Sequence, residues 1–152
     1  MKSLIQRVNK ASVSINGEVV GAINKGICVL LGIRDTDNEK DIDYLINKIT
    51  TMRFFSKEES KFSATLEQVN GGVLLVSQFT LYANLRKGTR PSFTSAMLLE
   101  QANQLYELFI TKLRKAGINV ETGEFGAYMQ VNIDNDGPVT LDLNSDHLEH
   151  HV

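Results

Sequence analysis

A short apolar run at residues 73–76 stands out in the middle of the chain because polar side chains follow it directly. Such a run, preceded by the turn-forming residues 70–71, is typical of a central strand that is buried on both faces. Ser77, Gln78 and Thr80 then bring three hydrogen-bonding groups into four positions. Each would cost roughly 1 to 3 kcal/mol if buried without a partner. Either the strand reaches the surface at Ser77, with Gln78 and Thr80 in solvent, or the polar groups belong to a site.

Alternating and apolar segments on both sides of this strand predict a sheet joined by short turns. Asn16-Gly17 is a strong hairpin signal, and an almost wholly apolar strand follows at residues 27–33. We expect residues 66–69 to pair with the central strand as a second hairpin, and residues 135–138 to separate two later strands. The other predicted strands are residues 2–8, 11–15, 18–23, 118–122, 128–133 and 139–143.

Two segments have the period of amphipathic helices. Residues 35–38 supply helix-capping side chains, and the apolar positions after them fall on one face of a helix that ends near Met52. A longer helix is predicted from Thr94 to Ala116, before a glycine that acts as its stop. Residues 56–63 are polar and charged, which predicts a loop.

Length and composition indicate one domain of an ordinary globular type. The 152 residues are 42% hydrophobic and 22% charged, with a formal net charge of -2. This composition lacks the basic footprint that duplex nucleic acid requires, so DNA is not an expected partner. A single-stranded RNA end remains compatible with it, because that ligand needs only a few cations and stacking surfaces.

No segment predicts a membrane-bound or secreted protein. The first residues become polar too early for a signal peptide and no apolar run approaches 18 residues, so we expect a soluble, cytoplasmic protein. The single cysteine, Cys28, lies in an apolar strand and is expected to fill the core. Residues 144–152 are expected to form a polar, flexible tail, which holds His147, His150 and His151.

Common catalytic arrangements are missing from the pattern. A Ser-His-Asp or Cys-His arrangement needs an imidazole held beside the nucleophile, and here every histidine lies in the tail, where chain ends fray. Asp134 and Asp136 flank a turn, where carboxylates are expected for hydrogen bonding alone. We therefore expect no metal and no cofactor. An enzyme of this kind would rely on backbone amides and on chemistry borrowed from its substrate.

Two short motifs, taken together, resemble the signatures of the D-aminoacyl-tRNA deacylase family. They are Ser77-Gln78-Phe79-Thr80 and Gly137-Pro138-Val139-Thr140, in the family's order and at its usual distance. Gln6-Arg7-Val8, Ala11-Ser12-Val13 and the segment 123–129 extend the resemblance over the whole chain. It implies an enzyme that hydrolyses the ester joining a D-amino acid, or mischarged glycine, to the terminal adenosine of tRNA. It also implies a homodimer of single mixed α/β (α+β) domains, each with a bent, barrel-like antiparallel sheet and two main helices packed on it.

By resemblance, the two signatures have different roles. Ser77, Gln78, Phe79 and Thr80 form the catalytic segment, mainly by positioning the substrate and offering backbone N–H groups, while the ribose 2'-hydroxyl assists. The Gly137-Pro138 pair is expected to be cis and to reach into the site of a partner subunit. There its carbonyls would bind the substrate's ammonium group and exclude L side chains. Taken alone, the second motif is also compatible with a tight turn.

Three other residues are candidates for the substrate site. Arg7 is expected either to hold the Gly-Pro turn or to be a surface arginine on an edge strand. Phe125 and Met129 are expected either to line a pocket for adenine or to belong to the core, since a flat apolar base needs flat apolar walls.

The one locally basic loop supplies the last candidates. Arg86, Lys87 and Arg90 are candidates for contacts with tRNA phosphates, although three cations in a loop are often simply solvated. Two other functions remain open on the sequence alone. One is a non-catalytic module that binds RNA ends or nucleotides, and the other is a small-molecule esterase or amidase that uses Thr80.

Overall fold

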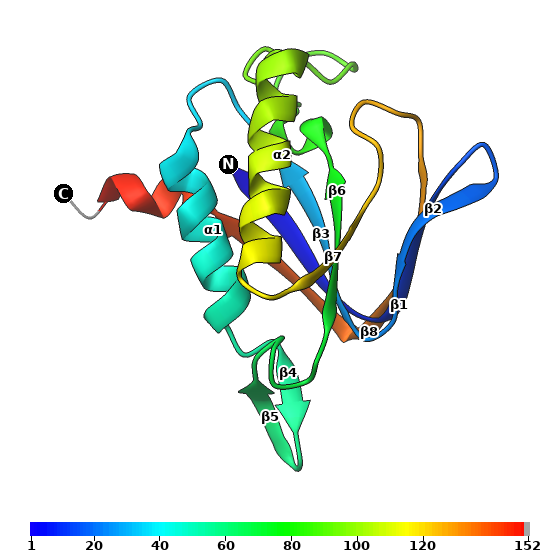
Figure 1. Ribbon diagram of the computed structural model, residues 1–152. Helices are drawn as coiled ribbons and strands as arrows, with labels where there is room; N and C mark the ends of the chain where they lie inside the picture. Colours follow the sequence, from blue (N-terminus) through cyan, green and yellow to red (C-terminus); the bar gives the residue numbers. More distant parts are fainter. Residues whose placement is uncertain (151–152) are drawn as a thin grey trace.

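The chain forms a strongly bent sheet that carries two helices on one face (Figure 1). The computed structural model describes residues 1–150, apart from the side chains of residues 147, 149 and 150. The elements in chain order are β1 (Lys2–Ile15), β2 (Glu18–Ile23), β3 (Gly26–Gly32), α1 (Glu39–Thr51), β4 (Phe55–Lys57), β5 (Ser60–Ala64), β6 (Gly72–Ser77), the 3-10 helix η1 (Phe79–Tyr82), α2 (Leu99–Lys115), β7 (Asn119–Thr122), β8 (Gln130–Asn144) and the 3-10 helix η2 (Ser145–His150).

Six strands form the main sheet in the order β2-β1-β3-β6-β7, and β8 pairs with the other side of β1. The long strand β1 changes neighbours: residues 2–8 pair with β3 and residues 11–15 with β2, while β8 follows both parts. Where β2 passes β7, a Cβ added to Gly21 would lie 2.6 Å from the carbonyl oxygen of Thr122. This close approach of the two outer strands curls the sheet into a nearly closed barrel.

Alternate residues of the central strands enter two different cores. Val73 and Leu75 of β6 join the helix-side core, where α1 and α2 cover the sheet. The residues between and after them, Leu74 and Val76, join an inner core enclosed by the bent sheet. This inner core comprises Val8, Ala11, Val13, Ile23, Cys28, Leu74 and Val76. The prediction that the run at 73–76 is buried on both faces is therefore confirmed.

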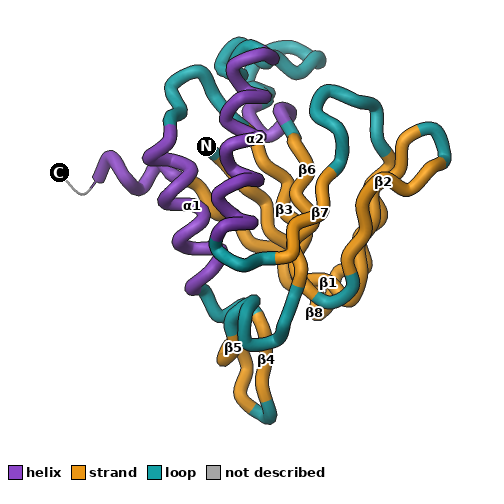
Figure 2. The backbone as a smooth tube through the Cα atoms, viewed as in Figure 1, coloured by secondary structure: helices purple, strands orange, loops and turns teal. Residues whose placement is uncertain are grey.

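The two helices lie on the same side of the sheet and cover the helix-side core (Figure 2). Asn38 caps α1 in a reciprocal capping box with Asp41, and the helix buries Ile42, Leu45 and Ile49. α2 buries Ala102, Tyr106, Phe109, Ile110 and Leu113. The expected mixed fold with two main helices on a barrel-like sheet is thus confirmed. No helix in the described part of the chain has the length and apolar character needed to cross a bilayer.

The expectation of an antiparallel sheet and of a hairpin at 66–72 is wrong. β6 pairs in parallel with both β3 and β7, and residues 66–69 form turns. Parallel neighbours need a crossover connection, and α1 lies between β3 and β6 in the chain as α2 lies between β6 and β7. The sheet is mixed because two helices connect its central strands.

Three element boundaries also differ from prediction. The expected loop at 56–63 contains the small β4–β5 hairpin. Residues 94–98 are not helical, because their backbone is hydrogen-bonded to the segment that follows β3: Asp35 N–H donates to Ser95 O (3.3 Å) and Met97 N–H to Ile33 O (3.2 Å). Residues 135–138 do not break the last strand, because β8 pairs with β1 on both sides of a register shift.

The predicted flexible tail does not begin at residue 144. Asn144 is the last residue of β8 and pairs with Lys2. Ser145 is buried, and its N–H donates to the Met1 carbonyl at 2.9 Å. These contacts hold the start of the segment against β1, whereas residues 151–152 lie outside the described residues.

Candidate active site

A pocket of about 510 Å³ opens at the end of β6, where the polar side chains follow the buried strand. Its walls come from the end of β6 and η1, from the start of α2, and from the segment between β7 and β8. A larger hollow of about 660 Å³ between β1, β2 and β8 contains no residue of the two signatures. The residues lining the pocket are Val76, Ser77, Gln78, Phe79, Thr80, Leu99, Phe125, Gly126, Ala127, Tyr128, Met129 and Val131.

The local backbone explains why the polar side chains reach this pocket. The N–H of Gln78 donates to Leu31 O at 2.7 Å, and the chain then turns into η1. Ser77 and Gln78 are half-buried, whereas Phe79 and Thr80 are exposed. The strand therefore reaches the surface at Ser77, and the residues after it line the pocket. The interpretation that the strand surfaces at Ser77 is confirmed, and the role of the polar groups in a site stays a prediction.

A side-chain hydrogen bond holds the catalytic candidates in place. The Nε2 group of Gln78 donates to the hydroxyl oxygen of Thr80. None of the lining residues carries a carboxylate, imidazole or amine that could take a proton from this hydroxyl. Among the described residues, the pocket lining therefore offers no base that would make Thr80 a nucleophile.

Phe125 forms a wall that is fixed from behind. Its ring packs against Tyr106 with a centroid distance of 5.6 Å, and the Tyr106 hydroxyl donates to Leu75 O at 2.9 Å. Burial raises the pKa of Tyr106, so the phenol remains a protonated donor. Met129 packs against the inner core. Phe125 and Met129 are thus both core neighbours and pocket walls.

Six lining residues were not among the predicted site residues: Val76, Leu99, Gly126, Ala127, Tyr128 and Val131. Tyr128 is the most exposed of them, with 88% of its surface accessible at the pocket mouth. In the sequence, only the glycine-flanked segment 123–127 indicated that residues near Phe125 form part of the site. It could not show which strand end the segment would face, because that depends on the pairing of β6 with β7.

The Gly-Pro signature lies in the register shift of β8, and its peptide bond is cis, as expected. The Arg7 guanidinium holds this bend: Nε donates to Asp136 O (3.3 Å) and pairs with the Asp136 carboxylate (3.2 Å), while Nη1 donates to Phe54 O (3.0 Å). The Arg7 side chain is only 14% exposed, so it is a structural part of the bend rather than a free surface arginine.

The structure does not bring the two signatures together within one chain. Neither Gly137 nor Pro138 lines the pocket, and both are exposed. In Figure 1 the end of β6 lies at the upper end of the sheet and the bend of β8 at the lower end. Arg7 lies at the bend that contains Gly137 and Pro138. Residues 77–80 line one pocket together with Phe125 and Met129.

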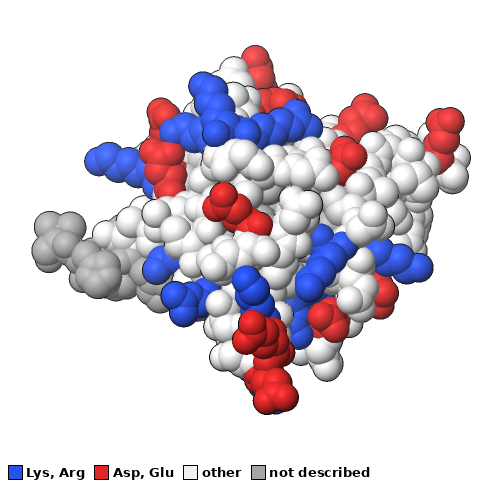
Figure 3. Space-filling model, turned by 60° about the horizontal axis from the view of Figure 1, so that its bottom comes forward, with Lys and Arg blue, Asp and Glu red and all other residues white. Residues whose placement is uncertain are grey.

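The three predicted loop cations are all exposed. Arg86 lines a separate hollow of about 560 Å³ together with Lys2 and Tyr82, and Lys87 and Arg90 are exposed. Figure 3 shows Lys and Arg interspersed with Asp and Glu on the face that it draws.

Comparison with known proteins supplies the family. The model of the family described as D-Tyr-tRNA(Tyr) deacylase matches residues 4–144. The chain belongs to this deacylase family. It is 51% identical over 146 residues to the D-aminoacyl-tRNA deacylase of Thermosipho melanesiensis, covering 95% of this chain and 97% of that protein. It is 50% identical over 145 residues to the enzyme of the same name from Aquifex aeolicus, with coverage of 95% and 98%.

Two solved structures share the deacylase fold. One, described as the c-Myc DNA Unwinding Element Binding Protein, matches with a TM-score of 0.90 and 44% identity, covering 95% of this chain and 99% of the other. The second is described as a probable eukaryotic D-amino acid tRNA deacylase and matches with a TM-score of 0.80, with coverage of 93% and 98%. Its identity is 16%, so it supports the fold alone.

The side chains of His147, His150 and His151 lie outside the described residues. Among the side chains that are described, no group of three or more His, Cys, Asp or Glu has an arrangement that could hold a metal ion.

Proposed function

We propose that this protein hydrolyses the ester bond of D-aminoacyl-tRNA and releases the D-amino acid and free tRNA. The observation that carries the proposal is the pocket at the end of β6, which joins the complete Ser77 to Thr80 signature to the apolar walls Phe125 and Met129. The names of the relatives from Thermosipho melanesiensis and Aquifex aeolicus support the same reaction.

The pocket suits a reaction that needs no base from the protein. We place the terminal adenine against Phe125 and Met129, with the ester beside residues 77–80. Backbone N–H groups of this segment then stabilise the charge that develops on the ester oxygen, which is worth roughly 2.7 to 4 kcal/mol per donor in other hydrolases. The adjacent ribose 2'-hydroxyl supplies the assistance that no lining side chain provides.

Chirality is proposed to be selected by the Gly137-Pro138 bend of a partner subunit. The bend is exposed, is held by Arg7, and lies away from the pocket of its own chain, so a second chain is needed to complete the site. Gly137 has a φ of +126°, and an added Cβ would lie 2.9 Å from Val139 Cγ2 and 3.2 Å from Arg7 Nη2. The bend therefore presents backbone, which excludes L side chains while accepting D-amino acids and glycine.

Contacts with tRNA phosphates are proposed for Arg86, Lys87 and Arg90. Such contacts weaken with added salt and act equally on all tRNA sequences. The name of one structural relative refers to a DNA element. We do not extend that role to this protein, because its net charge of -2 does not favour binding to duplex DNA.

The test is hydrolysis of matched D-Tyr-tRNA and L-Tyr-tRNA by the purified protein. We expect rapid loss of the D ester and survival of the L ester. A non-catalytic RNA-end module would leave both esters intact or protect them. Cleavage of both at similar rates would contradict selection by the Gly-Pro bend.

Two further substrates and one variant separate the proposal from an ordinary esterase that uses Thr80. D-Tyr-tRNA ending in 2'-deoxyadenosine should be nearly inert, and Thr80→Ala should retain partial activity. The reverse pair of results would make Thr80 the nucleophile. Sedimentation at micromolar concentration should show a dimer, and a monomer that still rejects L-Tyr-tRNA would rule out selection in trans.

A further inference from the structure

Gly123 opens the segment that carries the pocket wall, directly after β7. Its φ lies outside the left-handed region, so the backbone conformation does not require glycine. The surrounding atoms do require glycine, because an added Cβ would lie 2.5 Å from Met129 Sδ and 3.5 Å from Val13 Cγ2. Favourable contacts between carbon atoms lie at roughly 3.5 to 4.0 Å. A methyl group on Gly123 is therefore incompatible with the observed position of the Met129 thioether.

The thioether has only one direction in which it can yield. On one side Met129 packs against the inner core, whose members Val13, Leu74 and Val76 are at most 1% exposed. Protein interiors are close-packed and do not accept a displaced side chain without strain. On the other side Met129 lines the pocket. A methyl group at position 123 would therefore push the thioether toward the pocket.

Phe125, the other apolar wall of the pocket, is fixed in place. Phe125 rests on Tyr106, and Tyr106 is hydrogen-bonded to Leu75 O in the central strand. The space beside Phe125 is thus set by the position of Met129, which in turn depends on the missing side chain at Gly123.

We propose that Gly123 is a positioning residue for substrate binding. Its bare backbone lets Met129 lie against the barrel, which keeps the slot beside Phe125 wide enough for the flat base of the terminal nucleotide. This inference rests on the proposed function, in which that slot receives the terminal adenosine.

The role predicts an effect on binding that is separate from folding. Methionine has a flexible side chain that changes rotamer at little cost. Replacing glycine by alanine at an ordinary φ also lowers the entropy of the unfolded chain, which favours the folded state. Gly123→Ala should therefore leave the melting temperature unchanged or slightly raised while it narrows the slot.

The experiment compares Gly123→Ala, Met129→Ala and the double variant. KM and kcat are measured with D-Tyr-tRNA. The Kd is measured by calorimetry with a non-hydrolysable probe, D-tyrosine joined by an amide to 3'-amino-3'-deoxyadenosine. Gly123→Ala should raise KM and Kd on the order of tenfold, the size that one methyl group of misfit produces in a pocket. Its kcat should not change, as expected when binding alone is lost.

The double variant decides whether Gly123 acts through Met129. With the thioether removed, the added methyl group meets no obstacle, so the double variant should bind the probe as Met129→Ala does. Equal losses from Gly123→Ala in both backgrounds would overturn the proposal, as would an unchanged Kd in a folded Gly123→Ala protein.

Gly71→Ala is the matched control. A Cβ there would lie 2.9 Å from Leu66 Cδ1, a buried side chain at the opposite end of β6. This change should lower the melting temperature and leave Kd unaltered. An equally large drop in melting temperature for Gly123→Ala would assign it a structural role and overturn the inference. A wild-type protein that binds the probe but does not cleave D-Tyr-tRNA would refute the proposed reaction, while the Kd comparison would still test Gly123.

Discussion

At the scale of single residues, the position of the polar groups after β6 depends on the turn of the backbone from the strand into η1. Once Gln78 has donated its N–H to Leu31, the chain leaves the sheet and turns into η1. The same change exposes Phe79 and Thr80 and brings the side chain of Gln78 onto the hydroxyl of Thr80. A short polar stretch after a buried strand thus becomes one wall of a pocket.

Cys28 gives a prediction on pH at this scale. The thiol is fully buried, and burial raises its pKa from 9.0 to about 12. Between these values the unfolded chain loses the thiol proton while the folded chain keeps it, so the stability contributed by this group falls as pH rises from about 9 to about 12. The slope is up to ~1.4 kcal/mol per pH unit.

The measurement is urea unfolding of wild type and Cys28→Ala at several alkaline pH values. Below about pH 9 the variant should be less stable because a cavity remains, and above that pH its stability should decline less steeply than that of the wild type. Burial also raises the pKa values of Tyr82 and Tyr106. Their contributions to the pH dependence of stability are the same in both proteins and cancel when the two curves are compared. Parallel curves would show that the thiol titrates normally in the folded state.

At the scale of elements, α2 links the helix-side core to the pocket. Tyr106 on this helix donates its hydroxyl hydrogen to Leu75 of β6 and supports the ring of Phe125. One helical residue therefore fixes the distance between the central strand and the segment that follows β7.

Tyr106→Phe tests this link. The variant keeps the ring and removes only the hydroxyl, so it should lose about 0.5 to 1.5 kcal/mol of unfolding free energy. Chemical denaturation measures the change. Tyr128→Phe is the control, because a side chain that is 88% exposed should alter stability by less than about 0.5 kcal/mol. An effect in Tyr106→Phe no larger than in this control would show that the hydroxyl bond contributes nothing.

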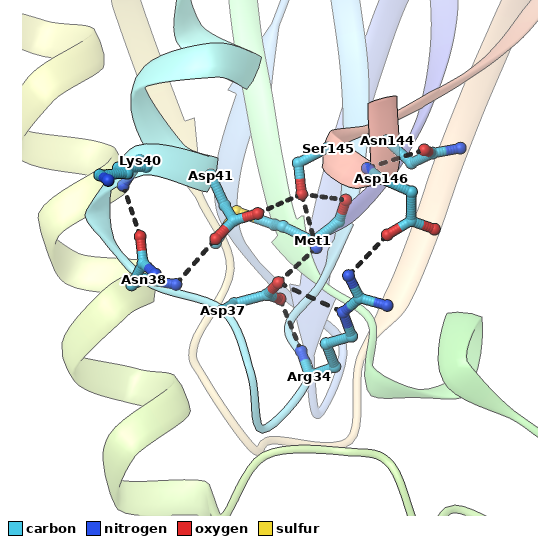
Figure 4. A network of polar contacts seen from close by, with 9 residues as sticks. All are labelled: Met1, Arg34, Asp37, Asn38, Lys40, Asp41, Asn144, Ser145 and Asp146. Carbon is cyan, nitrogen blue, oxygen red and sulfur yellow. Dashed lines mark hydrogen bonds and ion pairs between the residues drawn. The ribbon is translucent and has the colours of Figure 1, made fainter. Parts of the chain in front are cut away.

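At the scale of the whole molecule, a network of polar contacts ties the first strand to the end of the last (Figure 4). The Met1 ammonium donates to Asp37 Oδ1 (2.5 Å) and to Ser145 Oγ (2.9 Å), and Ser145 Oγ donates to Asp41 of the α1 cap. Arg34 pairs with Asp146 at 2.6 Å. β1, the loop before α1 and the residues after β8 therefore meet at one buried point.

Ser145→Ala tests how much this junction contributes to stability. The change leaves a buried ammonium hydrogen without one acceptor and should cost about 1 to 3 kcal/mol. Thermal unfolding by circular dichroism gives the comparison, with the exposed Ser56→Ala as the matched control. Equal melting temperatures for the two variants would mean that water or Asp37 replaces the lost contact.

Several features followed from the sequence because they depend on neighbours in the chain. The unbroken apolar run predicted the strand at 73–76 that is buried on both faces. The helical period of apolar positions predicted the buried faces of both helices, since side-chain direction is periodic in each element. The resemblance of the two motifs predicted the cis bond at Gly137-Pro138, and the family is now shown by direct comparison.

Other features depended on residues far apart in the chain, and the local pattern could not supply them. The direction of β6 is set by the crossover helices. Residues 94–98 are not helical because their backbone is hydrogen-bonded to the segment that follows β3. The Asn135 side chain accepts from Val139 N–H within the continuous strand β8. The site likewise needed the fold: Phe125, Met129 and Tyr128 meet Ser77 only because β7 lies beside β6.

The chain's own pattern was thus enough for the residue types of the candidate site: a polar strand end, apolar side chains for its walls, and a Gly-Pro pair with two open roles for Arg7. Tertiary structure alone decided that the strand end and the apolar walls form one pocket, and that the bend lies at the other end of the sheet. The physical reason is that the type of side chain at each position is local information, whereas pocket geometry depends on strand pairing between residues distant in the chain.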